Sequence, residues 1–531
     1  MPKLPVQAVP TPVSFTIDRP LGLMRRASRQ NLEQRYVRRK GGSISVETFL
    51  WDLKNGYIAR GKQGGWTIKQ RQGITKFNSV QKGTAEKFRG LFEVDFGGTK
   101  YVLARTGTSW SQYDEVDSFD DITGATGRGS DPASCAVSQA NDSSGNRIYV
   151  LADGGALLKF GSALTAAALG GTPLATSVDA VHLHQHHLWY NDLDNPMSAH
   201  YAASDNAENH TKTGDAGTLK LNETLPFQDT LIGFVTIAEV YLAFIFRNHT
   251  VIYYAGTEPA EFTLQQIVNV SCVSNRGIIQ PKKSDVILPS DEGMNSLRSA
   301  IVHQATELDD LTLNIADLYN TFRGAVGAAN LKQICGAWYP KLNHAYLSFP
   351  SADDPQILVY DPSIDEIVGR YQDIAAYSWL LREGGALLMG GAGYAYTFDS
   401  GTADDGVAME FAVDLPYLWL ADLERFKAPS EAEIVINADL DLTLMFTWFF
   451  GDDPTGLEIE SVTLSVEAAE SLWDVAVWDV ADWDAVGQDV VLTQDLFGRG
   501  RIIAVTLSHN TLNAIIEIPW WILRVFFEGR R

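Results

Sequence analysis

Residues 235–254 read Val-Thr-Ile-Ala-Glu-Val-Tyr-Leu-Ala-Phe-Ile-Phe, then Arg-Asn-His, then Thr-Val-Ile-Tyr-Tyr. Two runs rich in β-branched and aromatic residues, separated by a short polar turn, predict a β-hairpin. The surrounding stretch, residues 188–298, alternates apolar runs with turn-forming residues in the same manner. It therefore predicts a series of hairpins, each with one apolar face and one solvated face.

The same pattern of strand, tight turn and strand recurs along the chain. Each first strand is apolar, and each turn is polar or rich in glycine. The spacing is about 40–55 residues with one longer gap, and irregular repeats of this length favour a β-propeller. A β-sandwich with a similar number of strands stays open as the alternative. The repeats are Tyr101–Tyr113, Arg147–Phe160, His187–Tyr201, Tyr241–Tyr254, His344–Tyr360 and Ala386–Phe398.

Changes in composition divide the chain into five parts. We expect a mainly β protein with a β-propeller-like body, a partly helical insertion and a C-terminal β-domain. The insertion is predicted from alanine-rich segments with apolar residues at helical spacing, namely Leu311, Ile315, Leu318 and Phe322. The predicted parts are a basic extended N-terminal arm (1–45), the first part of the propeller (46–297), the insertion (298–340), the second part of the propeller (341–400) and the C-terminal β-domain (401–531).

The last part contains four longer strand patterns and a short tandem. The strands are expected at 408–417, 431–437, 441–450 and 458–466. Trp-Asp pairs then recur every five residues, at Trp473, Trp478 and Trp483, a period that fits neither a strand nor a helix. Each pair is expected to begin a tight turn in which the carboxylate caps backbone amides.

Charge is unevenly distributed along the chain. The 531 residues carry a formal net charge of −23, whereas the first 45 hold nine basic and two acidic side chains. An acidic body repels phosphates and argues against ordinary nucleic-acid binding. We expect the basic arm to contact a partner protein, with a phosphate-binding segment and a free tail as alternatives. The basic residues concerned are Arg25, Arg26, Arg29, Arg35, Arg38, Arg39 and Lys40.

Cysteine usage and hydropathy restrict the class of protein further. Cys135, Cys272 and Cys335 are far apart and odd in number, which argues against a disulfide framework or a zinc site and indicates a reducing compartment. The first 18 residues lack the apolar core of a signal peptide. No uncharged apolar run reaches the roughly 18 residues of a membrane span, so none is expected.

One group of histidines suggests a metal site. His182, His184 and His186 alternate, so on a strand they share one face, with His187 on the other. Three imidazoles on one face can bind zinc or nickel. No carboxylate or cysteine at short spacing completes a known site. A solvated or partner-facing strand is therefore the favoured interpretation, and we expect neither a metal nor a cofactor.

The sequence nominates no catalytic residue. The motifs of serine hydrolases, phosphate-binding loops, zinc proteases and calcium loops are missing from the sequence. Glycoside hydrolysis needs two neighbouring carboxylates, but 65 acidic residues produce such pairs by chance. We therefore expect the protein not to be an enzyme.

Several segments, taken in order, resemble the tail nozzle (tail hub) proteins of short-tailed bacteriophages. The likeness covers about residues 46–400 and consists of the order of the segments, not of one diagnostic motif. The segments are Trp51–Tyr57, Arg71–Lys76, Asn195-Pro196, Tyr201–Ser204, Gly214–Leu221, Tyr241–Tyr254, Phe262–Ile267, Cys272–Ser274, Asp285–Leu288 and Gly293–Arg298, followed by the Trp-Asp run.

The resemblance implies a β-propeller protein of the virion tail that is assembled in the host cytoplasm. Six copies form a ring below the adaptor, which itself lies under the portal. The ring continues the DNA channel, holds or gates the genome until ejection, and carries tail fibres or spikes. Double-stranded DNA passes through it without sequence-specific binding, and the family brings no catalytic residues.

Two other functions stay open at this point. The first is a tail fibre or spike protein that binds glycans of the host surface. The second is an enzyme that degrades host polysaccharide. A hexameric ring favours the nozzle, binding to a glycan array favours the fibre, and release of sugar favours the enzyme.

Overall fold

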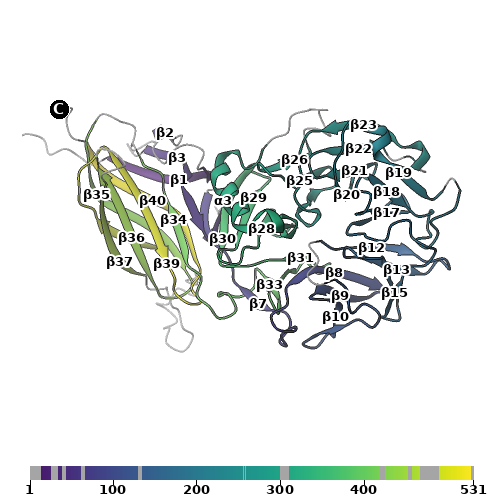
Figure 1. The fold of residues 1–531 in the computed structure, drawn as a ribbon. Helices are drawn as coiled ribbons and strands as arrows, with labels where there is room; N and C mark the ends of the chain where they lie inside the picture. The colour runs from purple at the N-terminus through teal and green to yellow at the C-terminus, as the bar shows by residue number, and fades with distance from the viewer. Residues whose placement is uncertain are drawn as a thin grey trace, which may run out of the picture. The chain divides into compact units, whose positions relative to one another are not determined.

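A computed structural model describes residues 13–24, 34–38, 44–60, 66–129, 134–213, 215–254, 256, 259–298, 310–418, 425–451, 457–466 and 489–527. The chain forms two compact units (Figure 1). The first unit comprises Met1–Ile74, Glu366–Tyr371 and Asp399–Arg531, and the second comprises Thr75–Asp365 and Gln372–Phe398. The second unit is therefore inserted into the sequence of the first.

The second unit begins with four sheets, each built from four antiparallel strands in chain order. Each sheet is one blade of a β-propeller, as the spacing of the sequence repeats predicts. The blades are β8–β11 (Phe88–Phe96, Thr99–Thr106, Ser109–Tyr113, Phe119–Asp121), β12–β15 (Ala136–Asn141, Arg147–Ala152, Leu158–Phe160, Ala166–Ala168), β16–β19 (Val181–His184, His187–Asn191, Ser198–Tyr201, Gly217–Lys220) and β20–β23 (Leu231–Ile237, Tyr241–Phe246, Thr250–Tyr254, Thr263–Val268).

Three further groups of strands complete the ring of blades. Strand β24 contacts β27, β27 contacts β31, and β31 contacts β8 of the first blade. Among the described residues, six sheets of three or four strands are thus separate blades. Strands β27–β29 belong to a larger sheet and lie between the blade β24–β26 and the blade that contains β31–β33. The groups are β24–β26 (Ile279–Lys282, Asp285–Pro289, Met294–Ser296), β27–β29 (Cys335–Tyr339, His344–Phe349, Gln356–Asp361) and β31–β33 (Ser378–Leu381, Leu387–Gly390, Ala395–Phe398), the last joined by β7 (Ile74–Lys76).

The ring is closed by the first strand of the propeller sequence. Strand β7 is the outermost strand of the sheet that also contains β31–β33. The amide of Phe77 donates to the carbonyl oxygen of Ala395 at 2.8 Å, and the amide of Ala395 donates to Oδ1 of buried Asn78 at 2.7 Å. The two ends of the propeller sequence are therefore held together in one blade.

Blades pack against each other through alternate side chains of the same strand. On β17, Leu188 and Tyr190 belong to the core shared with β12–β15, whereas Trp189 belongs to the core shared with β20–β23. Successive residues of a strand point to opposite faces, so a blade between two others is buried on both faces. The expectation that each hairpin has one solvated face is wrong for these central strands, all five residues of β17 being buried.

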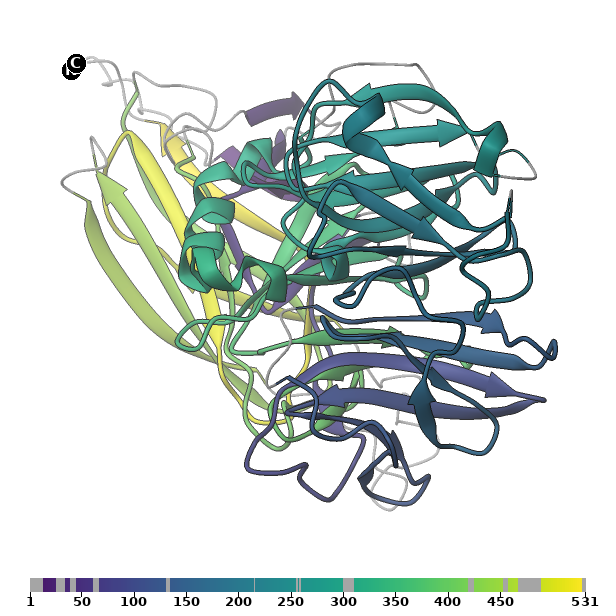
Figure 2. The ribbon, with the colours of Figure 1, turned by 45° about the vertical axis from the view of Figure 1, so that its right-hand side comes forward.

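Helical turns lie where the sequence predicts them. They are η3 (Leu313–Ile315), α3 (Ala316–Val326) and η4 (Ala328–Gln333), and Figure 2 shows them beside strands of similar colour. Leu311, Ile315, Leu318 and Phe322 are all buried. The ring of Phe322 contacts that of Phe349 on β28, with 5.9 Å between centroids. The insertion ends earlier than predicted, because Cys335 already begins β27. The remaining short helices are α1 (Leu221–Thr224), η1 (Pro259–Glu261) and η2 (Asn275–Gly277).

The first unit contains two sheets. One has the order β2-β3-β1-β40-β35-β38, with β6 pairing both β40 and β5, and the other runs β30-β4-β34-β39-β36-β37 within this unit (Figure 1). Their strands are β1 (Val13–Leu23), β2 (Gln34–Arg38), β3 (Ile44–Leu50), β4 (Asp52–Lys54), β5 (Gly56–Arg60), β6 (Trp66–Gln70), β30 (Glu366–Gln372), β34 (Phe411–Asp414), β35 (Lys427–Ala438), β36 (Leu442–Gly451), β37 (Glu458–Val466), β38 (Asp489–Asp495), β39 (Ile502–His509) and β40 (Ile516–Phe527).

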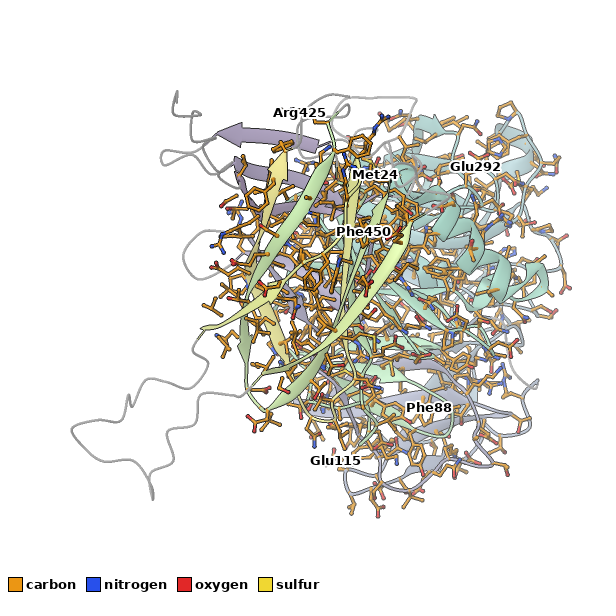
Figure 3. All side chains as sticks on the ribbon, turned by 90° about the vertical axis from the view of Figure 1, so that its left-hand side faces the viewer. Met24, Phe88, Glu115, Glu292, Arg425 and Phe450 are labelled. Carbon is orange, nitrogen blue, oxygen red and sulfur yellow. The ribbon has the colours of Figure 1, made fainter. Side chains whose placement is uncertain are left out.

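These two sheets pack face to face as a β-sandwich. The structure leaves no room for a side chain at Gly56 of β5, where a Cβ atom would lie 2.7 Å from Cε2 of Phe411 on β34. Nε2 of buried His509 on β39 lies 2.9 Å from Oε1 of Gln70 on β6. Side chains such as Phe450, labelled in Figure 3, fill the interior.

The units differ from the predicted parts at the N-terminus. Residues 13–23 are not an extended arm, because β1 pairs with β40 and β3 inside the sandwich. Residues 44–70 also belong to the sandwich and not to the propeller, which begins at Thr75. Both differences have one cause: β1 and β6 pair with β40, and β4 pairs with β34, and local sequence patterns carry no information about partners so far along the chain.

Candidate functional site

The basic residues predicted to contact a partner are only partly within the described residues. Arg35 and Arg38 lie on β2, which pairs with β3 at the edge of a sandwich sheet. Arg25, Arg26, Arg29, Arg39 and Lys40 lie outside the described residues. The Trp-Asp tandem, 473–484, also lies outside them.

The histidine group does not form one face of a strand. Gln185 and His186 have φ angles of 46° and 68° and form a two-residue turn between β16 and β17. The turn directs His186 to Asp205, whose carboxylate oxygen lies 3.0 Å from Nδ1. Nδ1 of His187 bonds the carbonyl oxygen of Ala202 at 2.8 Å. The alternation that the sequence suggested therefore ends after two residues.

The two remaining histidines share one hydroxyl group. Oγ1 of Thr236, on β20 of the next blade, lies 2.7 Å from Nε2 of His182 and 2.8 Å from Nδ1 of His184. Burial lowers the pKa of both imidazoles to about 4, so both are neutral at pH 7. The hydroxyl then donates to one ring and accepts from the other. Among the described residues no group of three metal-binding side chains was found.

An axial cavity of about 330 Å³ lies where the first strands of the blades converge. Its walls combine apolar side chains with close backbone packing at Gly90, Gly233 and Gly336. At Gly90 a Cβ atom would lie 2.5 Å from Sγ of Cys135, so only glycine fits this position. The three cysteines of the chain are all buried as free thiols, and burial raises the pKa of each. They are packing groups of the core and not reactive thiolates.

Arg276 is part of the wall of this cavity. It lies in η2, and its guanidinium donates to the carbonyl oxygens of Arg89, Tyr377 (3.0 Å) and Lys332 (3.1 Å). These carbonyls precede or begin the first strands of three different blades. Guanidinium is suited to this role because it presents five donors in one plane. Arg276 thus joins segments that are far apart in sequence.

The neighbouring residue continues the same network on the other side. Oδ1 of Asn275 accepts from the hydroxyl of Ser134 at 2.5 Å, and Nδ2 donates to the carbonyl oxygen of Asp179 at 3.3 Å. Ser134 and Asp179 lead into β12 and β16. Asn275 and Arg276 therefore tie five other blade entrances to a single turn.

A second cavity, the loop pocket, lies on the same face of the propeller. It has a volume of about 500 Å³ and is lined by loops that precede first strands or join second strands to third strands. Its polar wall contains Arg128, Ser134, Asp153, Asp179 and Lys332, and its glycines are Gly127, Gly129, Gly154 and Gly155. A Cβ atom at Gly127, Gly129 or Gly154 would meet nothing within 4 Å.

The floor of the loop pocket is a buried charge cluster. Oδ2 of Asp153 accepts from Nε of Arg105 at 3.0 Å and from Nε1 of Trp110 at 3.1 Å, and both carboxylate oxygens accept from Arg128. Burial raises the pKa of Asp153, but the hydrogen bonds and charges of Arg128 and Arg105 outweigh it and hold that pKa below its usual value. The carboxylate is therefore ionised and faces two guanidinium groups.

Sequence reasoning did not nominate any residue of these two cavities. Asp153 lies in the turn of the repeat Arg147–Phe160, and Arg276 lies just after the segment Cys272–Ser274. Each acquires its role from carbonyls or charges on several blades, and no motif of fixed spacing describes such a set. The one signal for these cavities in the sequence is an arginine next to a glycine at a predicted turn. This combination is common in loops and does not identify a site.

Comparison with known proteins concerns the fold. No family model and no curated protein matches the chain. Similar solved structures include a streptogramin B lyase (11% identity, TM-score 0.41, covering 61% of this chain and 97% of that one), U3-55K (12%, 0.39, 61% and 99%) and the WD40 β-propeller domain of Doa1 (9%, 0.39, 61% and 95%). Such low similarity carries no argument about activity.

Two statements about the class of protein follow from the described residues. No helix among them is long and apolar enough to cross a membrane. The order and pairing of strands β7–β33 make the second unit a β-propeller, and the chain as a whole is a mainly β protein.

Proposed function

We propose that this chain is a structural subunit of a bacteriophage tail nozzle. Six copies form a ring below the adaptor, DNA passes through the centre of the ring, and fibres or spikes attach around it. The grounds for the virion are the resemblance of residues 46–400 to nozzle proteins and the acidic composition, since a net charge of −23 disfavours adhesion to phosphate. The role is non-catalytic.

The observation that carries the assembly is an exposed face of the sandwich. On β36 and β37 the outward residues include Met445 and Ile459, with 53% and 61% of their surface exposed. Between them, Thr447 and Ser461 are directly paired and joined by a hydroxyl hydrogen bond of 3.0 Å. We call these four residues the sandwich patch. A flat patch of methyl, thioether and hydroxyl groups is suited to contact with another subunit.

The geometry of the propeller supports a passage between subunits and not through one of them. The axial cavity of about 330 Å³ has the size of a small-molecule site, and Arg276 lies in its wall. A duplex cannot pass through it. A closed ring of copies, joined by two complementary surfaces on each subunit, provides the passage.

The assembly is tested by measuring the oligomeric state of the purified full chain. Native mass spectrometry and negative-stain microscopy are expected to show hexameric rings with a central opening. The variants Met445→Glu and Ile459→Glu place charges on the sandwich patch and are expected to lower the hexamer fraction at least about tenfold, because each buries an unpaired charge. Val116→Glu is the matched control, since Val116 is 77% exposed in a propeller loop.

A monomeric wild-type protein at all concentrations, or rings that form equally in all three variants, would contradict this role of the sandwich patch.

The basic arm needs a different test, because β1 is part of the sandwich and deletion would damage the fold. Replacing Arg25, Arg26, Arg29, Arg35, Arg38, Arg39 and Lys40 with glutamine preserves length. We expect weaker, less salt-dependent binding to the adaptor–portal complex.

A further inference from the structure

Two cationic side chains, Arg128 and Lys332, line the loop pocket, although the protein as a whole is acidic. The side chains of Arg105, Arg128 and Lys332 face the carboxylates of Asp153 and Asp179. Arg105 and Arg128 share the single carboxylate of Asp153, which leaves one guanidinium charge in excess.

Two cationic groups of the pocket keep donors for a further partner. Arg128 uses Nε and Nη2 on Asp153 and on the carbonyl oxygen of Ala156, and both nitrogens are fixed by these bonds. Its Nη1 has no hydrogen bond in the described part of the chain. Nζ of Lys332 lies 3.6 Å from Oδ2 of Asp179, which is longer than a hydrogen bond, and the side chain is 43% exposed.

The negative groups nearby are already engaged. Oδ1 of Asp179 accepts from Nδ2 of Asn191 at 2.7 Å. In the adjoining loop, Asp192 accepts from Nδ2 of Asn195 at 2.7 Å and from the amide of Asp194 at 2.9 Å. The carboxylate of Asp194 accepts from the hydroxyl of Thr176 at 3.2 Å. These interactions hold the carboxylates in turns of the loops, whereas Nη1 of Arg128 and Nζ of Lys332 keep donors that a ligand can use.

Shape and size indicate the class of ligand. The volume of about 500 Å³ is in the range of small-molecule sites. Gly127 and Gly154 have positive φ angles and no side chain, so backbone forms part of the wall and a ligand can approach it closely. Apart from Leu193, the wall is polar, charged or glycine. Such a wall suits a hydroxylated ligand and not an apolar one.

We propose that the loop pocket binds a small polar anion, a carboxylate or phosphate group carried on a body of the size of a sugar residue. Arg128, held in place by Asp153, and Lys332 contact the anionic group. The glycine loops contact the hydroxylated body. All residues that line the pocket belong to the second unit, whereas the sandwich patch belongs to the first, so binding can be measured whether or not hexamers form.

The test measures binding of defined small molecules to the full-length protein by isothermal titration calorimetry and saturation-transfer NMR. The probes are glucuronate, glucose 6-phosphate, inorganic phosphate and glucose. We expect binding of the two charged sugars, which weakens as salt increases, and no binding of glucose. Glucuronate and glucose 6-phosphate distinguish a carboxylate from a phosphate source, and inorganic phosphate shows whether the sugar body contributes.

Lys332→Met and Arg128→Met are expected to weaken binding by about tenfold or more, because each removes a charged donor. Lys283→Met is the matched control: Lys283 lies in the turn between β24 and β25, on the opposite set of loops, and its loss removes the same charge. Lys332 is the main test, since it is partly exposed and its loss leaves the buried cluster intact. Absence of binding by every anion, equal binding of glucose, or an equal loss in Lys283→Met would overturn the proposal.

Discussion

The guanidinium of Arg276 donates a hydrogen bond of 3.0 Å to the carbonyl oxygen of Tyr377, which lies 101 positions later in the chain. The same group reaches back 187 positions to the carbonyl oxygen of Arg89. Phe88, beside Arg89 and labelled in Figure 3, begins the first blade. One side chain thus links the first blade to the last at their first strands, whereas β7 closes the ring at the outermost strand of the last blade.

Loss of this link is expected to destabilise the propeller. Arg276→Met keeps much of the side-chain volume but leaves the carbonyl oxygens of Arg89, Tyr377 and Lys332 without this donor. Buried acceptors without a donor cost about 1–3 kcal/mol each, and relaxation recovers part of this, so we expect a loss of about 2–4 kcal/mol. Urea unfolding followed by tryptophan fluorescence measures it. Arg147→Met is the control, because it removes one exposed hydrogen bond of 3.3 Å to the carbonyl oxygen of Asp95 and should lower stability by less than about 1 kcal/mol. Similar losses of stability in both variants would contradict a special role of Arg276.

The charge cluster at Asp153 predicts a second effect. Asp153→Asn removes the carboxylate that compensates Arg105, whose side chain is fully buried. Breaking one partner of a buried ion pair costs about 3–5 kcal/mol, and we expect a loss of this size in the free energy of unfolding at pH 7. Asp121→Asn, which removes a half-exposed carboxylate paired with Lys82, is the control and should cost about 1 kcal/mol or less. Equal effects of both substitutions would count against the cluster.

The same carboxylate gives stability a defined dependence on pH. The pKa of Asp153 in the folded protein lies below its usual value, so its contribution is present above the unfolded pKa of about 3.9 and is lost as pH falls through the lower folded value. The wild type should therefore lose stability below about pH 4. Asp153→Asn should show a smaller loss in this range, because it cannot bind the additional proton. Unfolding curves at pH 5, 4 and 3 check this, and identical slopes would contradict it.

His182 and His184 predict a pH effect in a different range. Their folded pKa values of about 4 lie below the unfolded value of about 6.5, so the unfolded chain binds more protons as pH falls. Stability should decrease between about pH 7 and 4, by about 1–3 kcal/mol for each imidazole. Burial lowers the pKa values of His210 and His509 to about 4 as well, so the double variant His182→Gln/His184→Gln should reduce this slope without abolishing it. His186→Gln, a side chain 67% exposed, should leave the slope unchanged. A double variant with the slope of the wild type would assign the effect to other groups.

The closure of the ring can be examined locally. Asn78→Ala removes the acceptor of the Ala395 amide and the donor to the carbonyl oxygen of Val80, both at 2.7 Å. We expect amides of β32 and β33 to exchange hydrogen about ten- to a hundredfold faster, since one or two buried hydrogen bonds are lost. Hydrogen exchange with mass spectrometry measures this. Asn146→Ala, in an exposed turn between β12 and β13, is the control, and exchange that rises equally in all blades would indicate global destabilisation.

Part of this architecture could be predicted from local pattern. The six hairpins quoted from the sequence correspond to adjacent strands within blades, for example Tyr241–Tyr254 to β21 and β22. The long gap between repeats hides β24–β26, whose strands are short and contain Pro281 and Pro289. Proline lacks an amide donor and is unusual in strands, so this blade lacks the apolar signature of the others.

The remainder depends on contacts that no local pattern contains. The sequence of β1 contains Asp18, Arg19 and Pro20, which are typical of an extended, solvated segment. Phe15 and Ile17 are nevertheless buried where β1 pairs with β40. The role of Arg276 exists only once three distant carbonyls converge on it. The loop pocket likewise combines loops from several blades. In each case the residue types were visible in the sequence, but their partners were not.

The pairing of β1 with β40 has a consequence for biosynthesis. Val13 is opposite Val525 in this ladder, so β1 can pair with β40 only after the residues up to 525 have left the ribosome. The propeller, whose sequence ends at Phe398, is translated in full well before then. The sheet that contains β1 and β40 is therefore completed only after the whole propeller sequence has been translated.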